Sequence, residues 1–254
     1  MSIKNKLLYL RRRWFPSKAE KIQEKKYEEK ILQFYKQIVY RGDLVFDIGA
    51  NIGNRTIPFL RMGAKVIAVE PQEKCRKYLQ KKLKKYRGGV IVPKGVGGKE
   101  GTSEFFISNA TTISSFSKEW IDSMKKERFK DFDWNKRVMI EMTTLDLLIE
   151  EYGLPSFIKI DVEGYEPEVL KGLSKPVKMV SFEYAVPEQR TKALMCIELL
   201  EKISSRYVFN YSIGEDMIFH LPEWVKSEEM KMIIDSDEFQ ETSCGDVYAK
   251  IIIV

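Results

Sequence analysis

The fold is decided by one stretch of the chain, Val45-Phe46-Asp47-Ile48-Gly49-Ala50-Asn51-Ile52-Gly53-Asn54-Arg55-Thr56. Its apolar start predicts a buried strand over residues 44–48, and its continuation predicts a helix over residues 55–62. Between them, Gly49 and Gly53 allow a sharp turn and a close approach of the backbone to a ligand. In an open parallel sheet, ligands bind beyond the carboxyl ends of the strands, at the first turn between strand and helix. We therefore expect a binding site at this turn.

The spacing within the turn separates two classes of nucleotide ligand. A dinucleotide-binding turn reads G-x-G-x-x-G and holds a pyrophosphate at the helix N-terminus. Here Asn51 replaces the central glycine, and the final spacing also differs. Asp47, at the end of the strand, would repel a pyrophosphate but suits the ammonium group of a methionine moiety. The amides from Asn51 to Asn54 could bind the carboxylate of that moiety.

The next strand supports this interpretation. Residues 65–69 form an apolar run that ends in Glu70 and Pro71. An acidic residue after the second strand is placed to accept hydrogen bonds from ribose hydroxyls. The turn and the two acids together favour a nucleoside that carries an amino acid.

Strands and helices alternate along most of the chain. Strands are expected at residues 65–69, 90–93, 157–162, 179–182, 207–212, 217–220 and 246–254, and helices at residues 73–86, 145–151, 166–173 and 188–203. Alternation at this spacing predicts right-handed βαβ units in a mostly parallel sheet.

Two parts of the chain depart from this rhythm. We expect residues 1–42 to form a basic N-terminal helical extension. The catalytic domain is then expected at residues 43–254. Within that domain, residues 96–140 hold an added strand at 103–107 and then a long segment without a strong period. Such a segment is often functional, so we predict a lid or acceptor-binding insertion in which residues 111–117 and Trp120 close over an acceptor.

Positive charge is concentrated in two segments. Residues 1–42 carry a net charge of +8 and residues 73–87 a net charge of +7, although the whole chain carries only +6. These segments could meet nucleic acid, anionic lipid or an acidic substrate, or they could be solvated helix faces. Peripheral membrane contact through the N-terminal segment is one alternative.

The remaining composition points to a cytoplasmic protein. No apolar run approaches the ~20 residues that span a bilayer, and the N-terminus does not read as a secretory signal. Cys75, Cys196 and Cys244 are odd in number and far apart, so they fit neither a disulfide framework nor a metal cluster. We expect no metal, with a cation held by Asp161 and Glu163 as the alternative.

Three blocks of the sequence resemble the FkbM-type methyltransferase family. They lie at residues 46–53, 143–146 and 158–172, and the resemblance spans roughly residues 36–254. The most specific block is Lys159-Ile160-Asp161-Val162-Glu163-Gly164-Tyr165-Glu166; many relatives carry histidine where Tyr165 stands, so no role as a base is expected of it. The resemblance implies a class I, Rossmann-like α/β fold: a mostly parallel seven-stranded sheet with helices on both faces, here with the N-terminal helical extension.

The same resemblance implies S-adenosyl-L-methionine as the methyl donor and O-methylation of a sugar, a glycan or a small-molecule natural product. The residues that it assigns to donor binding, with their neighbours, are Asp47, Gly49, Asn51, Gly53, Asn54, Glu70, Pro71, Gly95, Val96 and Asp161. Glu70 would hold the ribose, and Gly95 and Val96 would lie near the adenine.

Methyl transfer to a hydroxyl suggests where to look for catalytic residues. The acceptor oxygen must lie about 3 Å from the methyl group, and a base within reach can take its proton. Asp161 and Glu163 stand at the carboxyl end of one expected strand and Glu183 at the end of the next, so these three carboxylates are the candidates for base and acceptor clamp. Lys159 is expected to pair with a carboxylate, and Glu166 to be a first-turn acid of the following helix.

Two other functions remain as alternatives. The basic segments suggest a nucleic-acid methyltransferase. However, Asp161-Val162-Glu163-Gly164 stands where DNA amino-methyltransferases usually carry Asn/Asp-Pro-Pro-aromatic, and clustered acids suit phosphates poorly. A non-catalytic module that docks through its N-terminal helices is the other alternative. His220, the only histidine, lies in an apolar context and is expected to be structural.

Overall fold

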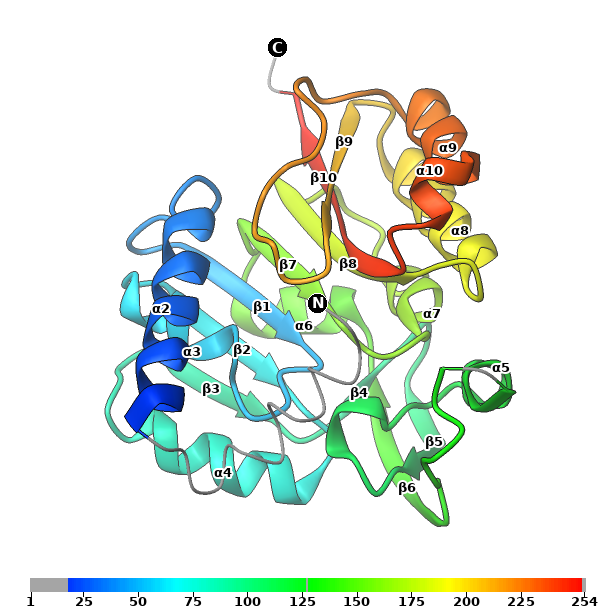
Figure 1. Cartoon of the computed structure of the whole chain (residues 1–254). Coiled ribbons are helices and arrows are strands. Elements are labelled where there is room, and N and C mark those ends of the chain that lie inside the picture. The colour runs from blue at the N-terminus through cyan, green and yellow to red at the C-terminus, as the bar shows by residue number, and fades with distance from the viewer. Residues whose placement is uncertain (1–17, 127, 253–254) are drawn as a thin grey trace.

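The computed structural model describes residues 18–126 and 128–252, whose centre is a seven-stranded sheet (Figure 1). Its strands are β1 (Leu44–Ile48), β2 (Lys65–Val69), β3 (Gly89–Val92), β7 (Phe157–Ile160), β8 (Met179–Ala185), β9 (Tyr207–Ile213) and β10 (Cys244–Ile251). They lie in the order β3-β2-β1-β7-β8-β10-β9. Strand β10 is antiparallel to both of its neighbours, and the other pairs are parallel. The expected class I, Rossmann-like α/β fold is confirmed.

Helices cover both faces of this sheet. One face carries α2 (Lys18–Tyr35), α3 (Thr56–Arg61) and α4 (Glu73–Leu83), and the other carries α6 (Leu145–Tyr152), α7 (Glu166–Leu170) and α8 (Arg190–Ile203). Alternate residues of a strand point to opposite faces. Accordingly, Val45 joins the core beneath α2 and α3, whereas Phe46 joins the core beneath α6 to α8.

Helix α2 packs on the sheet with an apolar face. Its residues Ile31, Phe34 and Tyr35 are buried and share a cluster with Phe59 and Phe157. Whether residues 1–42 form a unit of their own stays a prediction. The first 17 residues, with much of the expected basic extension, lie outside the described residues.

The segment expected to be irregular holds a second, smaller sheet. Strands β4 (Gly95–Val96), β5 (Gly101–Ile107) and β6 (Lys136–Thr143) lie in the order β4-β6-β5. The short helix η1 (Thr111–Ile113) and helix α5 (Lys118–Lys126) connect β5 to β6. The added strand at residues 103–107 is confirmed. Strand β6 escaped prediction because most of its side chains are exposed or half-buried, so no apolar run marks it.

The prediction of one strand is wrong. Residues 217–220 form a loop rather than a strand. Their apolar character has another cause, since Met217 is buried with a φ of 53° and the Phe219 ring packs on Phe34 of α2. Beyond this loop, α9 (Ser227–Asp235) packs beside α8, and α10 (Asp237–Gln240) packs on α9.

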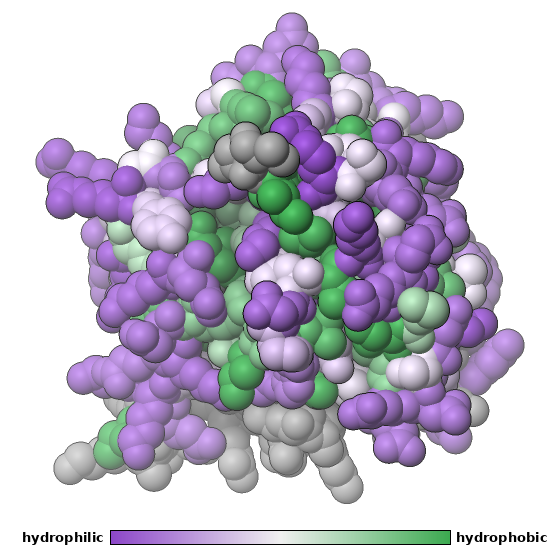
Figure 2. Space-filling view, turned by 90° about the horizontal axis from the view of Figure 1, so that it is seen from above, coloured by the Kyte–Doolittle hydropathy of each residue, from purple (hydrophilic) through white to green (hydrophobic). Residues whose placement is uncertain are grey.

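The face of the molecule seen from above is mainly hydrophilic (Figure 2). Figure 2 shows the molecule from above, with hydrophobic side chains in limited patches between charged ones. Among the described residues, no helix has both the length and the apolar composition needed to cross a bilayer.

Candidate active site

A pocket opens at the carboxyl ends of β1, β2 and β7, and we call it the first-turn pocket. Ten of the predicted site residues line it: Asp47, Gly49, Asn51, Asn54, Glu70, Pro71, Gly95, Val96, Asp161 and Glu163. The other two, Gly53 and Glu183, do not. The fold therefore gathers these residues from four separate segments of the chain at one edge of the sheet.

The backbone of the turn explains its glycines. Gly49 has a φ of +82°, and a Cβ atom there would lie 1.9 Å from the carbonyl oxygen of Asp161. No side chain fits at that distance, so the close approach of β1 to the end of β7 requires glycine. Gly53 has a φ of +84°, and a Cβ there would lie 2.5 Å from Leu79 of α4. Gly53 therefore serves the packing of α4.

Glu70 is buried and fixes the shape of the pocket. Its two carboxylate oxygens accept hydrogen bonds from the backbone amides of Asn51 and Gln72, each at 2.7 Å. Burial raises the pKa of Glu70 to about 7, although the two backbone donors act against this. The acid thus ties the end of β2 to the turn after β1.

Asp47 is buried at the end of β1. Its carboxylate accepts a hydrogen bond from the Thr56 hydroxyl of α3. Burial raises the pKa of Asp47, while the Thr56 hydrogen bond and the charge of Lys159 lower it. These contacts hold the carboxylate against the wall of the first-turn pocket.

Lys159 is an ammonium group buried within the sheet, with only 2% of the residue exposed. Its Nζ lies 3.0 Å from Asp161 Oδ2 and 3.5 Å from Asp246 Oδ1. Burial lowers the pKa of Lys159, but the two carboxylates outweigh burial and the pKa lies well above its ordinary value. The expected pairing of Lys159 with a carboxylate is confirmed.

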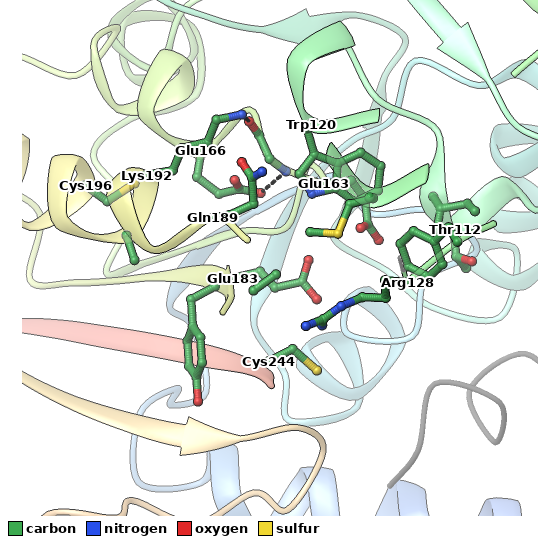
Figure 3. Close-up of a pocket in the computed structure, with 17 residues that line it drawn as sticks. Thr112, Trp120, Arg128, Glu163, Glu166, Glu183, Gln189, Lys192, Cys196 and Cys244 are labelled. Carbon is green, nitrogen blue, oxygen red and sulfur yellow. Dashed lines mark hydrogen bonds between the residues drawn. The ribbon is translucent and has the colours of Figure 1, made fainter. Parts of the chain in front are cut away.

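The three predicted catalytic carboxylates lie together. Asp161, Glu163 and Glu183 each offer an oxygen atom, and these atoms lie within 4.8 Å of one another. Figure 3 shows Glu163 and Glu183 facing the same cavity from different elements. Oxygens at this spacing could share a proton or a cation, so the cation alternative stays a prediction.

The turn after β7 is fixed from two sides. Glu166, in the first turn of α7 as expected, accepts hydrogen bonds from the amides of Val162 and Gly164, each at 3.1 Å. Burial raises the pKa of Glu166 to about 7. Glu163 has a φ of 56°, and its carbonyl oxygen accepts a hydrogen bond from the Ser115 hydroxyl at 2.7 Å. The insertion therefore contacts the turn that carries two candidate carboxylates.

A second pocket adjoins the first on the α8 side, and we call it the α8 pocket (Figure 3). Thr112 and Glu163 line both pockets, and Glu183 lines only this one. The other lining residues are Ile113, Trp120, Met124, Arg128, Phe129, Gly164, Glu166, Tyr184, Ala185, Gln189, Lys192, Ala193, Cys196 and Cys244. The candidate carboxylates thus stand where the two pockets meet.

Sequence reasoning missed several of these residues. Arg55 lines the first-turn pocket and is ion-paired with Glu215, which follows β9 and lies 160 residues away. Nothing in the sequence marks Glu215, because the contact depends on how the loop after β9 folds back. By contrast, Thr112 and Trp120 lie in the segment predicted to reach an acceptor.

The only histidine lies outside both pockets. His220 pairs with Asp216 and stacks on Tyr211, with ring centroids 5.4 Å apart. Within the described residues no disulfide joins the three cysteines, and Cys196 and Cys244 line the α8 pocket.

Known proteins with similar sequences point to one family. The sequence profile of the methyltransferase FkbM domain matches residues 47–213. The hexuronic acid methyltransferase AglP of Haloferax volcanii is 26% identical over 165 residues, which cover 64% of this chain. The matched region spans 63% of the length of that relative.

Two solved structures with low sequence identity match most of this chain. A precorrin-6y C5,15-methyltransferase from Geobacter metallireducens has a TM-score of 0.47 and 12% identity, and the match covers 89% of this chain and 86% of that one. An rRNA methylase from Streptococcus thermophilus has a TM-score of 0.43 and 12% identity, with coverage of 87% and 94%.

Proposed function

Because this chain belongs to the FkbM methyltransferase family, with S-adenosyl-L-methionine as its methyl donor, we propose that it methylates an oxygen atom of a sugar or glycan. A hydroxyl of another small-molecule natural product is the alternative acceptor within the same reaction. One observation carries the proposal: Asp161, Glu163 and Glu183 meet at the junction of two pockets. A relative described as a hexuronic acid methyltransferase supports the choice of a sugar.

The residues of the first-turn pocket fit this donor. Two buried carboxylates, Asp47 and Glu70, suit an ammonium group and ribose hydroxyls respectively. One side of the pocket offers apolar surface for a purine. It is formed by Val96 of β4, Phe105 of β5 and Phe116. The Gly49 turn lies against the end of β7 and exposes its backbone in the pocket wall. When bound, the donor supplies an electrophilic methyl group on a positively charged sulfur.

The protein's own part in the reaction is to orient the acceptor and to take its proton. Proton removal by a positioned carboxylate accelerates attack by a hydroxyl oxygen. We assign this role to the group Asp161, Glu163 and Glu183, with one member as base and the others as clamp. Lys159 orients Asp161 from inside the sheet, and Glu166 fixes the backbone of the turn.

The test is methyl transfer from labelled donor to a panel of monosaccharides and glycosides. Glu163→Gln and Glu183→Gln each remove a charge while preserving shape, and each should lower kcat about 10²-fold or more because a base or clamp is lost. Glu150→Gln is the matched control, since Glu150 is exposed on α6. Unchanged kcat in both site variants would refute the assignment of these carboxylates.

A further inference from the structure

The α8 pocket contains a hydrogen-bond acceptor that the protein does not use. Gln189 lies at the start of α8 and is 8% exposed. Its Oε1 atom is buried and has no hydrogen-bond partner among the described residues. A buried polar atom without a partner is costly. Because Gln189 lines the α8 pocket, a bound molecule with a hydroxyl or amine can supply the missing donor.

The two cationic side chains of the pocket are engaged by the protein itself. Arg128 donates to both carboxylate oxygens of Glu188, at 2.9 and 2.7 Å, and to the carbonyl oxygens of Val186 and Ser243. Lys192 donates to the carbonyl oxygen of Gly164 at 2.7 Å and to the Ser117 hydroxyl at 3.0 Å. Both cations therefore serve to hold the pocket walls together.

The remaining ionisable groups make the pocket unfavourable for an anion. The carboxylates of Glu163 and Glu183 line it, together with the buried Glu166 carboxyl, whose pKa is raised to about 7, and the charge of Arg128 is matched by Glu188. Burial strengthens the repulsion between like charges because the effective dielectric constant is lower than in water. A ligand carboxylate would meet this negative lining, whereas a hydroxyl can donate to it.

One wall of the pocket is apolar and fixed. It consists of Trp120, Met124 and Phe129, all of which are buried and belong to the insertion. Trp120 packs directly on the turn after β7, since a Cβ atom on Gly164 would lie 2.1 Å from its indole ring. A site with an apolar wall and a few placed polar groups suits a compact organic ring rather than an extended polymer.

From these observations we propose that the α8 pocket is the acceptor subsite and that it takes an uncharged, hydroxylated ring such as a pyranose. Gln189 accepts a hydrogen bond from one ring hydroxyl, which orients the ring relative to Glu163 and Glu183. This inference rests on the proposed function, because it requires an acceptor oxygen next to the first-turn pocket. It adds that the pocket selects a neutral ring over a uronate.

The test measures binding of two probes to the full chain with the donor site filled by S-adenosylhomocysteine. The probes are methyl β-D-glucopyranoside and the methyl glycoside of glucuronate. Saturation-transfer NMR measures the binding of each. The neutral glycoside should bind at least about tenfold more tightly than the uronate. Gln189→Leu should weaken its binding by about three- to tenfold, as expected for one hydrogen bond. Gln80→Leu, on the exposed side of α4, should leave it unchanged.

Affinity for S-adenosylhomocysteine distinguishes a failure of the proposed function from a failure of the proposed subsite. If the wild-type chain does not bind it, the proposed function fails before the subsite is tested. If Gln189→Leu binds it normally, the variant is folded and its sugar affinity can be interpreted. With that binding intact, tighter binding of the uronate, absence of glycoside binding, or an unchanged affinity in Gln189→Leu overturns the proposed subsite.

Discussion

Lys159 Nζ lies 3.0 Å from Asp161 Oδ2, with the ammonium group buried inside the sheet and the carboxylate at its edge. The two residues are separated by one position in the chain, so the alternation of β7 directs both to the same side. Asp246 on β10 approaches the same ammonium at 3.5 Å. The orientation of a candidate catalytic carboxylate is therefore set from within the core.

Loss of this cation should destabilise the fold. Lys159→Met removes the charge that compensates Asp161 and Asp246, and breaking a buried ion pair typically costs about 3–5 kcal/mol. We expect a fall of this size in the free energy of unfolding, measured by urea denaturation. Lys175→Met, at an exposed position, should change it by less than about 0.5 kcal/mol. Equal stability of the two variants would contradict the assigned role of Lys159.

The close approach at Gly49 should tolerate no side chain. Gly49→Ala places a Cβ atom 1.9 Å from the Asp161 carbonyl oxygen, so the turn must shift. We expect at least a tenfold loss of donor affinity by calorimetry. Gly42→Ala is a matched control, because Gly42 also has a positive φ, +90°, but no atom lies within 4 Å of the added Cβ. Gly42→Ala should lower the free energy of unfolding by about 1–2 kcal/mol and leave donor affinity unchanged. A similar loss of donor affinity in the two variants would mean that the contact with the Asp161 carbonyl oxygen is irrelevant.

The contribution of Glu70 to stability should fall as pH rises through the range from about 4.5 to 7. The pKa of Glu70 is raised by burial from 4.5 to about 7, so the folded state binds a proton more tightly than the unfolded state. Stability then decreases with pH where the folded state holds more protons. The contribution of Glu70 should reach about 3 kcal/mol at most, at 1.36 kcal/mol for each pKa unit.

Glu70→Gln checks this directly. The substitution removes the titrating group, so urea denaturation at pH 5 and pH 7.5 should show a smaller decrease in stability than in the wild-type chain. Glu150→Gln, at an exposed position, should keep the wild-type dependence. An identical pH dependence in Glu70→Gln and the wild-type chain would show that Glu70 titrates normally.

Arg128 should control the mobility of the insertion. Its guanidinium joins the segment after α5 to Glu188 and to the carbonyl oxygens of Val186 and Ser243. Arg128→Lys cannot reproduce this forked pattern, so amide hydrogen exchange in residues 118–134 should become faster while exchange in β1 and β7 is unchanged. Protection that remains at the wild-type level would mean that hydrophobic packing alone holds the insertion.

The sequence predicted the elements whose signal is local. Strand β1 and its turn were recognised because an apolar run and two glycines lie within ten residues. Ten of the twelve predicted site residues line one pocket, because most of them end or follow a parallel strand at the same edge of the sheet. Gly53 was placed in the site on its motif position, but it does not line the pocket, and a Cβ atom there would meet Leu79.

Elements that depend on distant contacts were missed. Residues 217–220 look like a strand because Met217 and Phe219 are apolar, but these side chains pack on α2 from a loop. Glu215 reaches Arg55 only through the path of that loop. Gln189 likewise carries no local signal, because its role depends on the insertion that closes the α8 pocket.

The most direct test of the central claim is the identity of the atom that receives the methyl group. The purified chain, S-adenosyl-L-methionine labelled with ¹³C in its methyl group and a panel of glycosides would be incubated, and the products analysed by NMR. We expect a methyl group on a sugar oxygen, formed by the wild-type chain and by Glu150→Gln but not by Glu183→Gln. A methyl group on nitrogen or carbon, or no transfer to any sugar by a chain that binds the donor, would contradict it.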